Sequence, residues 1–498
     1  MSIRVGKAAK APAFPIAAHK ALENNQLRAN VRRATTTIRN KRALRVEEMP
    51  DWESLRSAGA AIKQHTLAHL DHYLEEFVRN CERAGGKVHW ARDADEANSI
   101  AINLIRTYTP KDSTAPVEVI KVKTMTSDEI QMNHALEREG IVPIETDLAD
   151  MIVQLGKDEP SHIVVPALHK NRTEIRDIFR ASMAQPELTD QPEDLTAAAR
   201  KYLRERFLRT KIAVSGANFA IADTGSVCVV ESEGNGRMCL TLPEVLITLV
   251  GIEKVIPSFG DLEVFLQTLP RSATGERMNP YNSLWTGVTP GDGPQHFHVI
   301  LLDNGRTKLL EDEMERETLQ CIRCAACLNA CPVYRETGGH AYGSIYSGPI
   351  GAILSPQLQS LEHSRSLPYA STLCGACYEV CPVKINIPEV LIHLRGRVVR
   401  EDQKTLKGKL GVENIAMQAA ATIFRSERRY EASQRLARIG QLAFERKGLL
   451  TNLPGMAGGW TATRDLKPIP SHSFRDWWKS RNNTTWSPKS NMSQGGAN

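Results

Sequence analysis

Apolar residues recur at helical spacing along residues 51–84, the first long pattern in the chain. They are Leu55, Ile62, Leu67, Leu70, Tyr73, Leu74, Phe77 and Val78. Gly85 and Gly86 follow, and glycine commonly ends a helix because it adopts the left-handed backbone conformation without strain. The pattern therefore predicts a long amphipathic helix that leads into the rest of the chain.

Short apolar runs and helical patterns alternate between residues 87 and 183. Strands are expected at 87–90, 117–123, 141–144 and 162–168. Helices are expected at 93–107, 127–139, 147–155 and 171–183. Strands that alternate with helices are typical of a parallel sheet covered by helices.

The next stretch, residues 211–303, reads mostly as strands joined by glycine-rich turns. Its apolar runs lie at 212–232, 236–242, 244–252 and 297–303. We therefore expect one α/β domain, which extends over residues 51–303 when the leading helix is included. Its cysteines stand in apolar contexts, and we expect them to be small buried hydrophobic residues rather than ligands: Cys81, Cys228 and Cys239.

The two ends of the chain differ from this domain. Residues 1–50 form a basic N-terminal arm that contains Arg28, Arg32, Arg33, Arg39, Lys41, Arg42 and Arg45. This arm is either a solvated helix face or mobile segment, or a docking arm for an acidic partner. A helical region is expected over 401–450 and an irregular tail over 451–498, and its final stretch, 486–498, has the composition of a disordered segment.

Composition and charge narrow the class of protein. The 498 residues suffice for two or three domains. The 63 basic and 57 acidic residues leave a net charge of +6, which does not indicate nucleic-acid binding. No run of about 18 apolar residues occurs, so no transmembrane segment is expected. Ten cysteines without a hydrophobic export segment indicate a cytoplasmic protein, either free or held at the inner membrane by partners.

The chemistry of the chain is expected in seven cysteines between residues 321 and 381. The first four follow the spacing C-x2-C-x2-C-x3-C-P and are Cys321, Cys324, Cys327 and Cys331. Bacterial two-cluster ferredoxins use this spacing: three thiolates wrap one cubane cluster, and the fourth cysteine binds the other cluster. A zinc site uses two pairs of cysteines and has no use for this pattern.

The second motif lacks its first cysteine. Cys374, Cys377 and Cys381 match the last three cysteines of the pattern, and Ser371 stands in the first position. Cross-ligation then assigns Cys321, Cys324, Cys327 and Cys381 to a first [4Fe-4S] cluster, and Cys331, Cys374 and Cys377 to a second. The long gap between the motifs resembles that of helical two-cluster modules, so we expect a mainly helical ferredoxin-type module over 311–400.

The second cluster is one ligand short, and three solutions stay open. Ser371 supplies an oxygen, although a hydroxyl is a poor ligand for iron. The cluster is instead a [3Fe-4S] cluster. In the third solution, the fourth iron is open, or it binds a residue from elsewhere in the chain or from a partner. We favour a four-iron cluster with such a non-cysteine or external ligand. His340, in the glycine-rich insert 338–356, is one such ligand candidate; the alternative is that this insert is a surface loop packed on the module.

Several stretches resemble the lactate utilization protein B family. They include SGANFAIADTGSVCVVESEGNGR (215–237), LPRSATGE (269–276), PGDGP (290–294) and GGHAYGSIYSGPIGAILSP (338–356). The resemblance runs over roughly residues 50–400 and includes the seven-cysteine layout. It implies that the first domain is a LUD-type α/β domain with a fold like those of CoA transferases and sugar-phosphate isomerases.

The resemblance also implies a function and partners. The family supplies the iron–sulfur subunit of a three-component bacterial system that oxidises L-lactate. The expected partners are a subunit with cysteine-rich domains and a smaller subunit related to this chain's first domain. The electron acceptor is not identified by the sequence.

Candidate residues for a pocket in the first domain lie in two polar turns. Asn218, Asp223 and Thr224 are in the first turn; Glu231, Glu233, Asn235 and Arg237 are in the second. A glutamate near such a turn acts as the nucleophile in CoA-transferase-like folds, so the catalytic candidates are Glu231, Asn218 and Asp223. Lys254 and Arg271 complete a pocket for lactate or another small acid. The alternative is that these residues satisfy turn backbone groups.

Three functions compete. The first is an electron-transfer subunit of a lactate-oxidising complex, not catalytic alone. The second is a CoA-transferase-like enzyme whose clusters are structural or sensory. The third is a scaffold that binds the other subunits and a small acid. No nicotinamide or flavin fingerprint and no P-loop occurs, which favours the first function.

Overall fold

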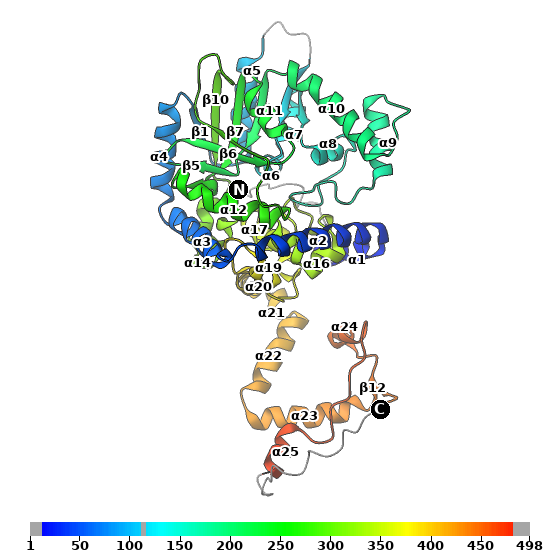
Figure 1. Ribbon diagram of the computed structural model, residues 1–498. Coiled ribbons are helices and arrows are strands. Elements are labelled where there is room, and N and C mark those ends of the chain that lie inside the picture. The colour runs from blue at the N-terminus through cyan, green and yellow to red at the C-terminus, as the bar shows by residue number, and fades with distance from the viewer. Residues whose placement is uncertain (1–11, 111–115, 482–498) are drawn as a thin grey trace. The chain divides into compact units, whose positions relative to one another are not determined.

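The computed structural model describes residues 12–110 and 116–481 (Figure 1). The chain divides into two compact units, residues 1–398 and residues 399–498. The first unit contains an α/β sheet domain followed by the cysteine-bearing module. The second unit is described by itself at the end of this section.

A six-stranded parallel sheet forms the centre of the first domain, in the order β1-β10-β7-β4-β2-β3. Its strands are β1 (Lys87–Ala91), β2 (Val117–Lys121), β3 (Ile141–Glu145), β4 (Ile212–Gly216), β7 (Val245–Gly251) and β10 (His296–Leu302). The predicted parallel α/β fold is therefore confirmed.

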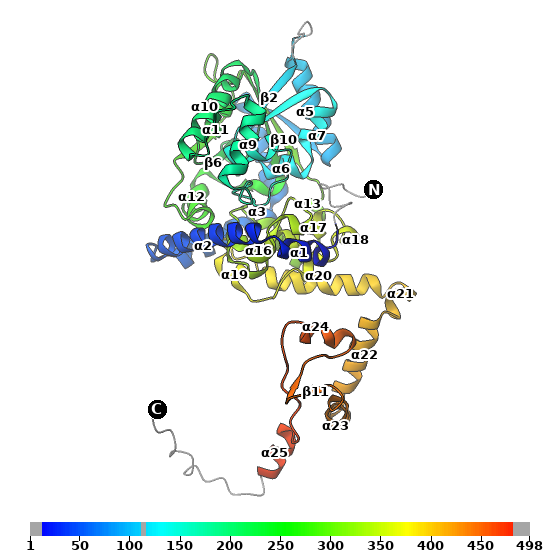
Figure 2. The same ribbon diagram turned by 90° about the vertical axis from the view of Figure 1, so that its right-hand side faces the viewer.

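Helices cover both faces of this sheet because successive strand residues point to opposite sides. Val119 packs with α5 (Ala94–Tyr108) and α7 (Met132–Arg138), and the short helix α6 (Met125–Glu129) contacts α7, β4 and β7. Ile120 packs on the other face, where the helices are α4 (Leu70–Arg83), α8 (Leu148–Leu155), α9 (Arg172–Met183), α10 (Pro192–Arg209) and α11 (Asn235–Thr241). Figure 2 shows α5 and α7 on one side of the sheet and α9, α10 and α11 on the other.

A second, smaller sheet follows from the strand-rich half of the domain. Its order is β8-β5-β6-β9, with β8 (Val255–Ile256), β5 (Phe219–Ile221), β6 (Ser226–Glu231) and β9 (Tyr281–Trp285). Cys81, Cys228 and Cys239 are fully buried, as predicted, and burial raises the pKa of each thiol to about 12. No disulfide joins any of the cysteines in the described residues.

The leading helix is broken where the sequence pattern is continuous. It forms α3 (Trp52–Ala68) and α4, and His69 between them has the non-helical backbone angles φ −127° and ψ 37°. Both halves contact β8, but α3 also packs on α12 (Phe259–Ala273), whereas α4 packs on β1. Because one straight helix could not reach both surfaces, the chain bends at His69.

Two predicted strands are absent from the structure. Residues 162–168 form a loop whose apolar side chains, Ile163 and Leu168, are buried against the cysteine module rather than in the sheet. Residues 236–242 lie mostly in α11. Two further helices, α10 and α12, were not predicted.

The cysteine module consists of short helices, as expected for a mainly helical module. They are α13 (Arg306–Leu310), α14 (Glu313–Arg316), α15 (Ala326–Ala330), α16 (Pro332–Thr337), α17 (Gly348–Leu358), α18 (Leu361–Ser364), α19 (Ala376–Val380) and α20 (Ile387–Asp402). One hydrophobic core contains residues of both the module and the first domain, such as Leu328 and Phe265. Module and domain are thus packed together in one unit.

The N-terminal residues are also helical and belong to this unit. They form α1 (Phe14–Glu23) and α2 (Asn25–Glu47). Figure 1 shows α2 as a long helix lying between α12 and the module, and it contacts α12, α15 and α16. The arm is therefore packed on its own chain.

The second unit contains the predicted C-terminal helices, α21 (Leu406–Lys409), α22 (Val412–Phe424) and α23 (Glu427–Gln441). A short hairpin, β11 (Glu445–Arg446) with β12 (Leu449–Leu450), ends the region that was expected to be helical. Two helices, α24 (Gly458–Thr461) and α25 (Phe474–Arg481), follow where an irregular tail was expected. The segment 486–498 lies outside the described residues. Over the ranges 12–110 and 116–481, every helix is too short or too polar to cross a membrane.

Candidate functional site

Four of the seven cysteines line one small buried cavity. They are Cys321, Cys324, Cys327 and Cys381, and the apolar side chains of Ile350, Val383 and Ile387 complete its wall. Burial raises the pKa of Cys324, and the negative charges of Cys381 and Cys321 add to the shift. The cysteine from the second motif, Cys381, therefore lies with the first three of the first motif.

The other three cysteines are also neighbours of one another. Burial and the charge of Cys331 raise the pKa of Cys377 to about 12, and Cys374 adds to the effect. Burial also raises the pKa of Cys331, again with a contribution from Cys374. Cys327 of the first group is close enough to Cys377 for their charges to interact, so the two groups adjoin.

The sulfurs are presented as iron–sulfur sites require. Backbone N–H groups donate to three of them: Arg323 to Cys321 Sγ at 3.4 Å, Tyr334 to Cys331 Sγ at 3.5 Å, and Ile385 to Cys381 Sγ at 3.4 Å. Such hydrogen bonds stabilise the thiolate form that binds iron. Buried, grouped thiolates with amide donors fit iron–sulfur clusters.

Ser371 repeats the local geometry of Cys321. In the first motif, Arg323 and Ala325 have positive φ angles of 62° and 59°; in the second, Leu373 and Gly375 have 55° and 83°. The Leu373 N–H donates to Ser371 Oγ at 3.1 Å, as the Arg323 N–H donates to Cys321 Sγ. The second loop is therefore folded like the first, with a hydroxyl where a thiol would stand.

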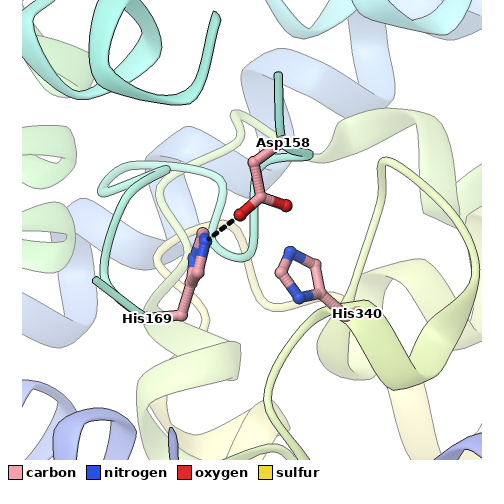
Figure 3. Close-up of side chains that lie close together, drawn as sticks. All are labelled: Asp158, His169 and His340. Atoms are coloured by element: carbon pink, nitrogen blue, oxygen red, sulfur yellow. Dashed lines mark hydrogen bonds and ion pairs between the residues drawn. The ribbon is translucent and has the colours of Figure 1, made fainter. Parts of the chain in front are cut away.

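His340 lies close to Asp158 and His169 (Figure 3). Its Nε2 lies 2.8 Å from the carbonyl oxygen of Glu159, and its ring centroid lies 4.7 Å from that of His169. His169 Nε2 lies 3.2 Å from Asp158 Oδ2. His340 therefore contacts the loop before α9, and the structure does not group it with Cys331, Cys374 and Cys377.

The two cysteine groups differ in exposure. Cys324, Cys327 and Cys381 are buried, whereas Cys374 is exposed. Tyr378, beside Cys377 in sequence, is 42% exposed. Cys321 is partly exposed, and Cys331 and Cys377 are buried, so the second group reaches the surface through Cys374 alone.

The basic N-terminal residues bind the module. Arg28 Nη2 lies 2.9 Å from Glu336 Oε2, and Arg32 pairs with the same carboxylate. Arg42 donates to the Val380 carbonyl at 3.1 Å, at the C-terminus of α19. Part of the predicted docking arm therefore docks on an acidic residue and a helix end of its own chain.

A buried network of charges joins the module to the sheet domain. Arg306 makes hydrogen bonds of 2.8 Å to both oxygens of Glu129 and one of 2.5 Å to Glu253. Arg323 Nη2 lies 3.3 Å from Glu253 Oε1, and its guanidinium stacks over Tyr346 at 4.9 Å. Arg323 therefore connects the first cysteine loop to the end of β7.

A second, larger cavity of about 370 Å³ lies in the sheet domain. Residues directly after β2 and directly after β4 line it, including Lys123 and Asn218. The chain leaves β2 toward β3 and leaves β4 toward β7, in opposite directions across the sheet. Open α/β sheets bind ligands at the carboxyl ends of strands where the order reverses in this way.

Close approach of two loops forms the floor of this cavity. A Cβ atom on Gly216 would lie 2.2 Å from Thr124 Oγ1, so only glycine fits at this position. Lys254 and Glu233 line the cavity wall, and Arg323 of the first cysteine loop lines it too. The cavity therefore borders the first cysteine group.

Glu231 and Asn218 line this cavity, but their polar atoms are engaged. Glu231 accepts hydrogen bonds from the backbone N–H groups of Glu233 at 2.9 Å, Gly234 at 2.6 Å and Arg237 at 3.2 Å. Asn218 Oδ1 accepts one from Val230 at 2.9 Å. Glu231 thus holds the turn before α11, which is the turn chemistry considered as an alternative.

Two other candidates lie elsewhere. Asp223 accepts the N–H of Phe259 at 3.1 Å, at the N-terminus of α12. Arg271 donates to the carbonyls of Gln267 and Arg277 at 2.9 and 2.8 Å. Neither residue lines the 370 Å³ cavity, and each satisfies backbone groups around α12.

Charged groups of the cavity have shifted pKa values. Burial raises the pKa of Glu233 to about 7, and the neighbouring Asp147 adds to the shift. Burial and the charge of Arg323 lower the pKa of Lys254 to about 8. Lys123 Nζ is 3.8 Å from Asp150 Oδ2. Lys123 and Arg323 were not predicted from the sequence, since neither belongs to a recognisable pocket motif.

Family models match most of the chain. A LUD domain model matches residues 74–302, and a 4Fe-4S dicluster domain model matches residues 317–385. A model described as lactate utilisation protein B, C-terminal, matches residues 393–483. A solved DUF162 family protein from Deinococcus radiodurans is 11% identical, with 47% of this chain and 98% of that chain covered; its TM-score of 0.25 carries no argument.

Curated relatives match over nearly their full length. Lactate utilization protein B of Bacillus velezensis is 42% identical, with 97% of this chain and 98% of the relative covered. The protein of the same name from Bacillus subtilis is 41% identical with the same coverage, and that from Bacillus licheniformis is 43% identical over 92% of this chain and 95% of the relative. This chain belongs to the lactate utilization protein B family.

Proposed function

We propose that this chain is the iron–sulfur electron-transfer subunit of a multi-component system that oxidises L-lactate to pyruvate. The observation that carries the proposal is the arrangement of the seven cysteines. They form two adjoining groups, one enclosed beside a cavity and one that reaches the surface at Cys374. The name of the relatives supplies the substrate.

In this proposal, Cys321, Cys324, Cys327 and Cys381 hold one [4Fe-4S] cluster, and Cys331, Cys374 and Cys377 hold the second. Such clusters supply one-electron oxidation and reduction. The second site has a fourth position open to a ligand other than cysteine, since Ser371 stands there. Both sites lie within one packed module.

The surroundings of the two cysteine groups indicate in which direction electrons would pass between the two clusters. Ile350, Val383 and Ile387 exclude water from the first group. Cys374 and the half-exposed ring of Tyr378 offer a face on which an acceptor can dock. We therefore place the donor side at the enclosed group and the acceptor side at Cys374.

The CoA-transferase alternative requires a free carboxylate nucleophile. The Glu231 carboxylate accepts three backbone N–H groups, which stabilise its charge and lower its reactivity. The geometry therefore favours electron transfer, with lactate chemistry completed by two partner subunits of the complex.

The test is reduction of the clusters by substrate. The full chain is purified without oxygen, and its brown absorbance is followed on addition of L-lactate, with and without the two partner subunits. We expect bleaching with the partners present and little without them. Clusters that stay oxidised in the complete complex, yet are reduced by dithionite, would refute the proposal.

A further inference from the structure

Three lysine side chains are almost completely buried in the first unit, and two of them have partners. Lys63 donates to the carbonyl oxygens of Glu253 and Val255. Lys121 donates to Asn133 and, at 2.7 Å, to Glu145. Both ammonium groups are thus compensated, as buried charges usually are.

Lys254 is the exception. Only 7% of this residue is exposed, and it lines the 370 Å³ cavity. Its ammonium group makes no hydrogen bond and no ion pair with the residues that the structure describes. A buried charge without a hydrogen-bonded partner is costly in free energy; the nearby charges of Glu253 and Cys321 offset part of that cost, and an anion in the cavity would offset more of it.

The place of the cavity supports the same conclusion independently. It lies where the connections after β2 and β4 diverge, at the carboxyl ends of parallel strands. This is the position at which open α/β sheets bind small molecules. Its volume lies within the usual range for small-molecule sites.

The charges around the cavity favour a monoanion. Arg323 is paired with Glu253, and Lys123 faces Asp150. Glu231 is held by backbone amides, and its charge would repel a multiply charged phosphate group. Asp147 and Glu233 add two more carboxylates to the lining, so a multiply charged anion is disfavoured. The Lys254 ammonium is the cation of the lining left without a hydrogen bond or ion pair among the described residues, and it is available for a single carboxylate.

Apolar side chains form much of the remaining wall. They include Val122, Met125, Ile163, Val229 and Leu269. Such a wall suits a short carbon skeleton, and the carboxylate would lie toward Lys254. Arg323 closes the cavity on the side of the first cysteine group.

We propose that this cavity binds a small organic monocarboxylate, a hydroxy or oxo acid, through the Lys254 ammonium group. The bound acid then lies against the loop that carries Cys321 and Cys324. The inference rests on the proposed function for the choice of acid, L-lactate or pyruvate. Binding itself needs no partner subunit.

The test is a direct binding measurement on the full chain. Protein with a determined iron content is titrated without oxygen by isothermal calorimetry, using L-lactate, pyruvate and the uncharged amide of L-lactate. We expect both acids to bind and the amide to bind at least tenfold more weakly. Equal binding of acid and amide, or no binding of either acid, overturns the proposal.

Variants locate the site. Lys254→Met is expected to weaken acid binding at least tenfold, whereas Lys308→Met, at an exposed lysine of α13, leaves it unchanged. Ala217→Leu fills the cavity and is expected to abolish binding while Lys254 is retained, so the test survives if Lys254→Met fails to fold. Unchanged binding in a folded Lys254→Met or Ala217→Leu protein overturns the proposal.

The outcomes separate this inference from the proposed function. If lactate reduces the clusters in the full complex but the chain alone binds no acid, the inference fails and the function stands. If the chain binds acid but the clusters are never reduced in the complex, the function fails and the site remains.

Discussion

Ser371 occupies the position of a cluster ligand in a loop that is folded like its cysteine counterpart. Ser371→Cys is therefore expected to complete a four-thiolate site without changing the loop. Ser371→Ala is expected to leave the iron content unchanged, because a hydroxyl is a weak ligand for iron. Iron analysis and electron paramagnetic resonance measure both effects, and loss of iron in Ser371→Ala would identify Ser371 as a ligand.

Cys331 and Cys381 each lie with the cysteines of the other motif. Cys381→Ala should therefore remove the cluster that Cys321 holds, and Cys331→Ala the cluster that Cys374 holds. Electron paramagnetic resonance of the reduced proteins distinguishes the two losses. Cys228→Ala, at a buried cysteine outside both groups, should keep the full iron content. Loss of the opposite cluster in each variant would show that ligation is not crossed.

His162 gives the fold a dependence on pH. Its Nδ1 accepts the N–H groups of Val164 and Val165 at 3.0 Å, and Nε2 faces Asn329 Oδ1 at 3.2 Å, so the ring is neutral. Burial and then the charge of Lys123 lower its pKa to about 4. Because the unfolded pKa is about 6.5, the stabilisation is complete above pH 6.5 and falls by about 1.4 kcal/mol per unit as pH decreases toward 4.

The variant His162→Asn tests this dependence, since the Asn oxygen can replace Nδ1 as an acceptor but does not titrate. Thermal unfolding midpoints are compared at pH 7.5 and pH 5.5. We expect the midpoint of the parent chain to fall more between these pH values than that of the variant. Parallel decreases would assign the acid sensitivity to other groups.

At the scale of elements, the buried charge network holds the cysteine module against the sheet. Arg306→Met leaves Glu129 and Glu253 without their main partner, which is expected to cost about 3–5 kcal/mol. Arg92→Met, which breaks an exposed pair with Glu96, should cost far less, because water screens exposed ion pairs. Urea unfolding followed by circular dichroism compares them, and similar losses would contradict a role for the network.

Most elements of the sheet domain were predictable because their apolar periodicity is local. The strand predicted at 162–168 was wrong because an apolar run does not reveal whether it is buried in a sheet or, as here, against another module. The helix α11 was missed because its start depends on Glu231, whose carboxylate binds the N–H groups of the turn and of Arg237.

The candidate site, too, contains parts that were predictable from the sequence and parts that were not. The cysteine groups follow from sequence spacing, since local geometry and cross-ligation fix which sulfurs can meet. Lys254 was a candidate from sequence, but its lack of a partner depends on how distant residues pack. Arg323 was hidden between two cysteines, and only the fold brings its side chain to the cavity.

At the scale of the whole molecule, the division into two compact units predicts that the first unit folds and holds iron without the second. A chain shortened to residues 1–402 keeps all of α20 and should retain the iron content and unfolding midpoint of the full chain. A chain shortened to residues 1–386 loses α20, whose Val390, Leu391 and Leu394 are fully buried. This shorter chain should have a lower iron content and a lower unfolding midpoint. Iron analysis with thermal unfolding measures the difference; loss of iron in the longer fragment would show that the first unit is not self-sufficient.

The position of Cys381 beside Cys321 bears on how the protein is made. A ribosome releases Cys321, Cys324 and Cys327 well before Cys381, and in the proposed ligand sets the first cluster has only three sulfurs until then. The second cluster in turn needs Cys331 from the earlier motif. With those ligand sets a growing chain completes neither site until the second motif has been made, so iron is delivered only to a chain that already contains both motifs, where α15 and α19 can come together.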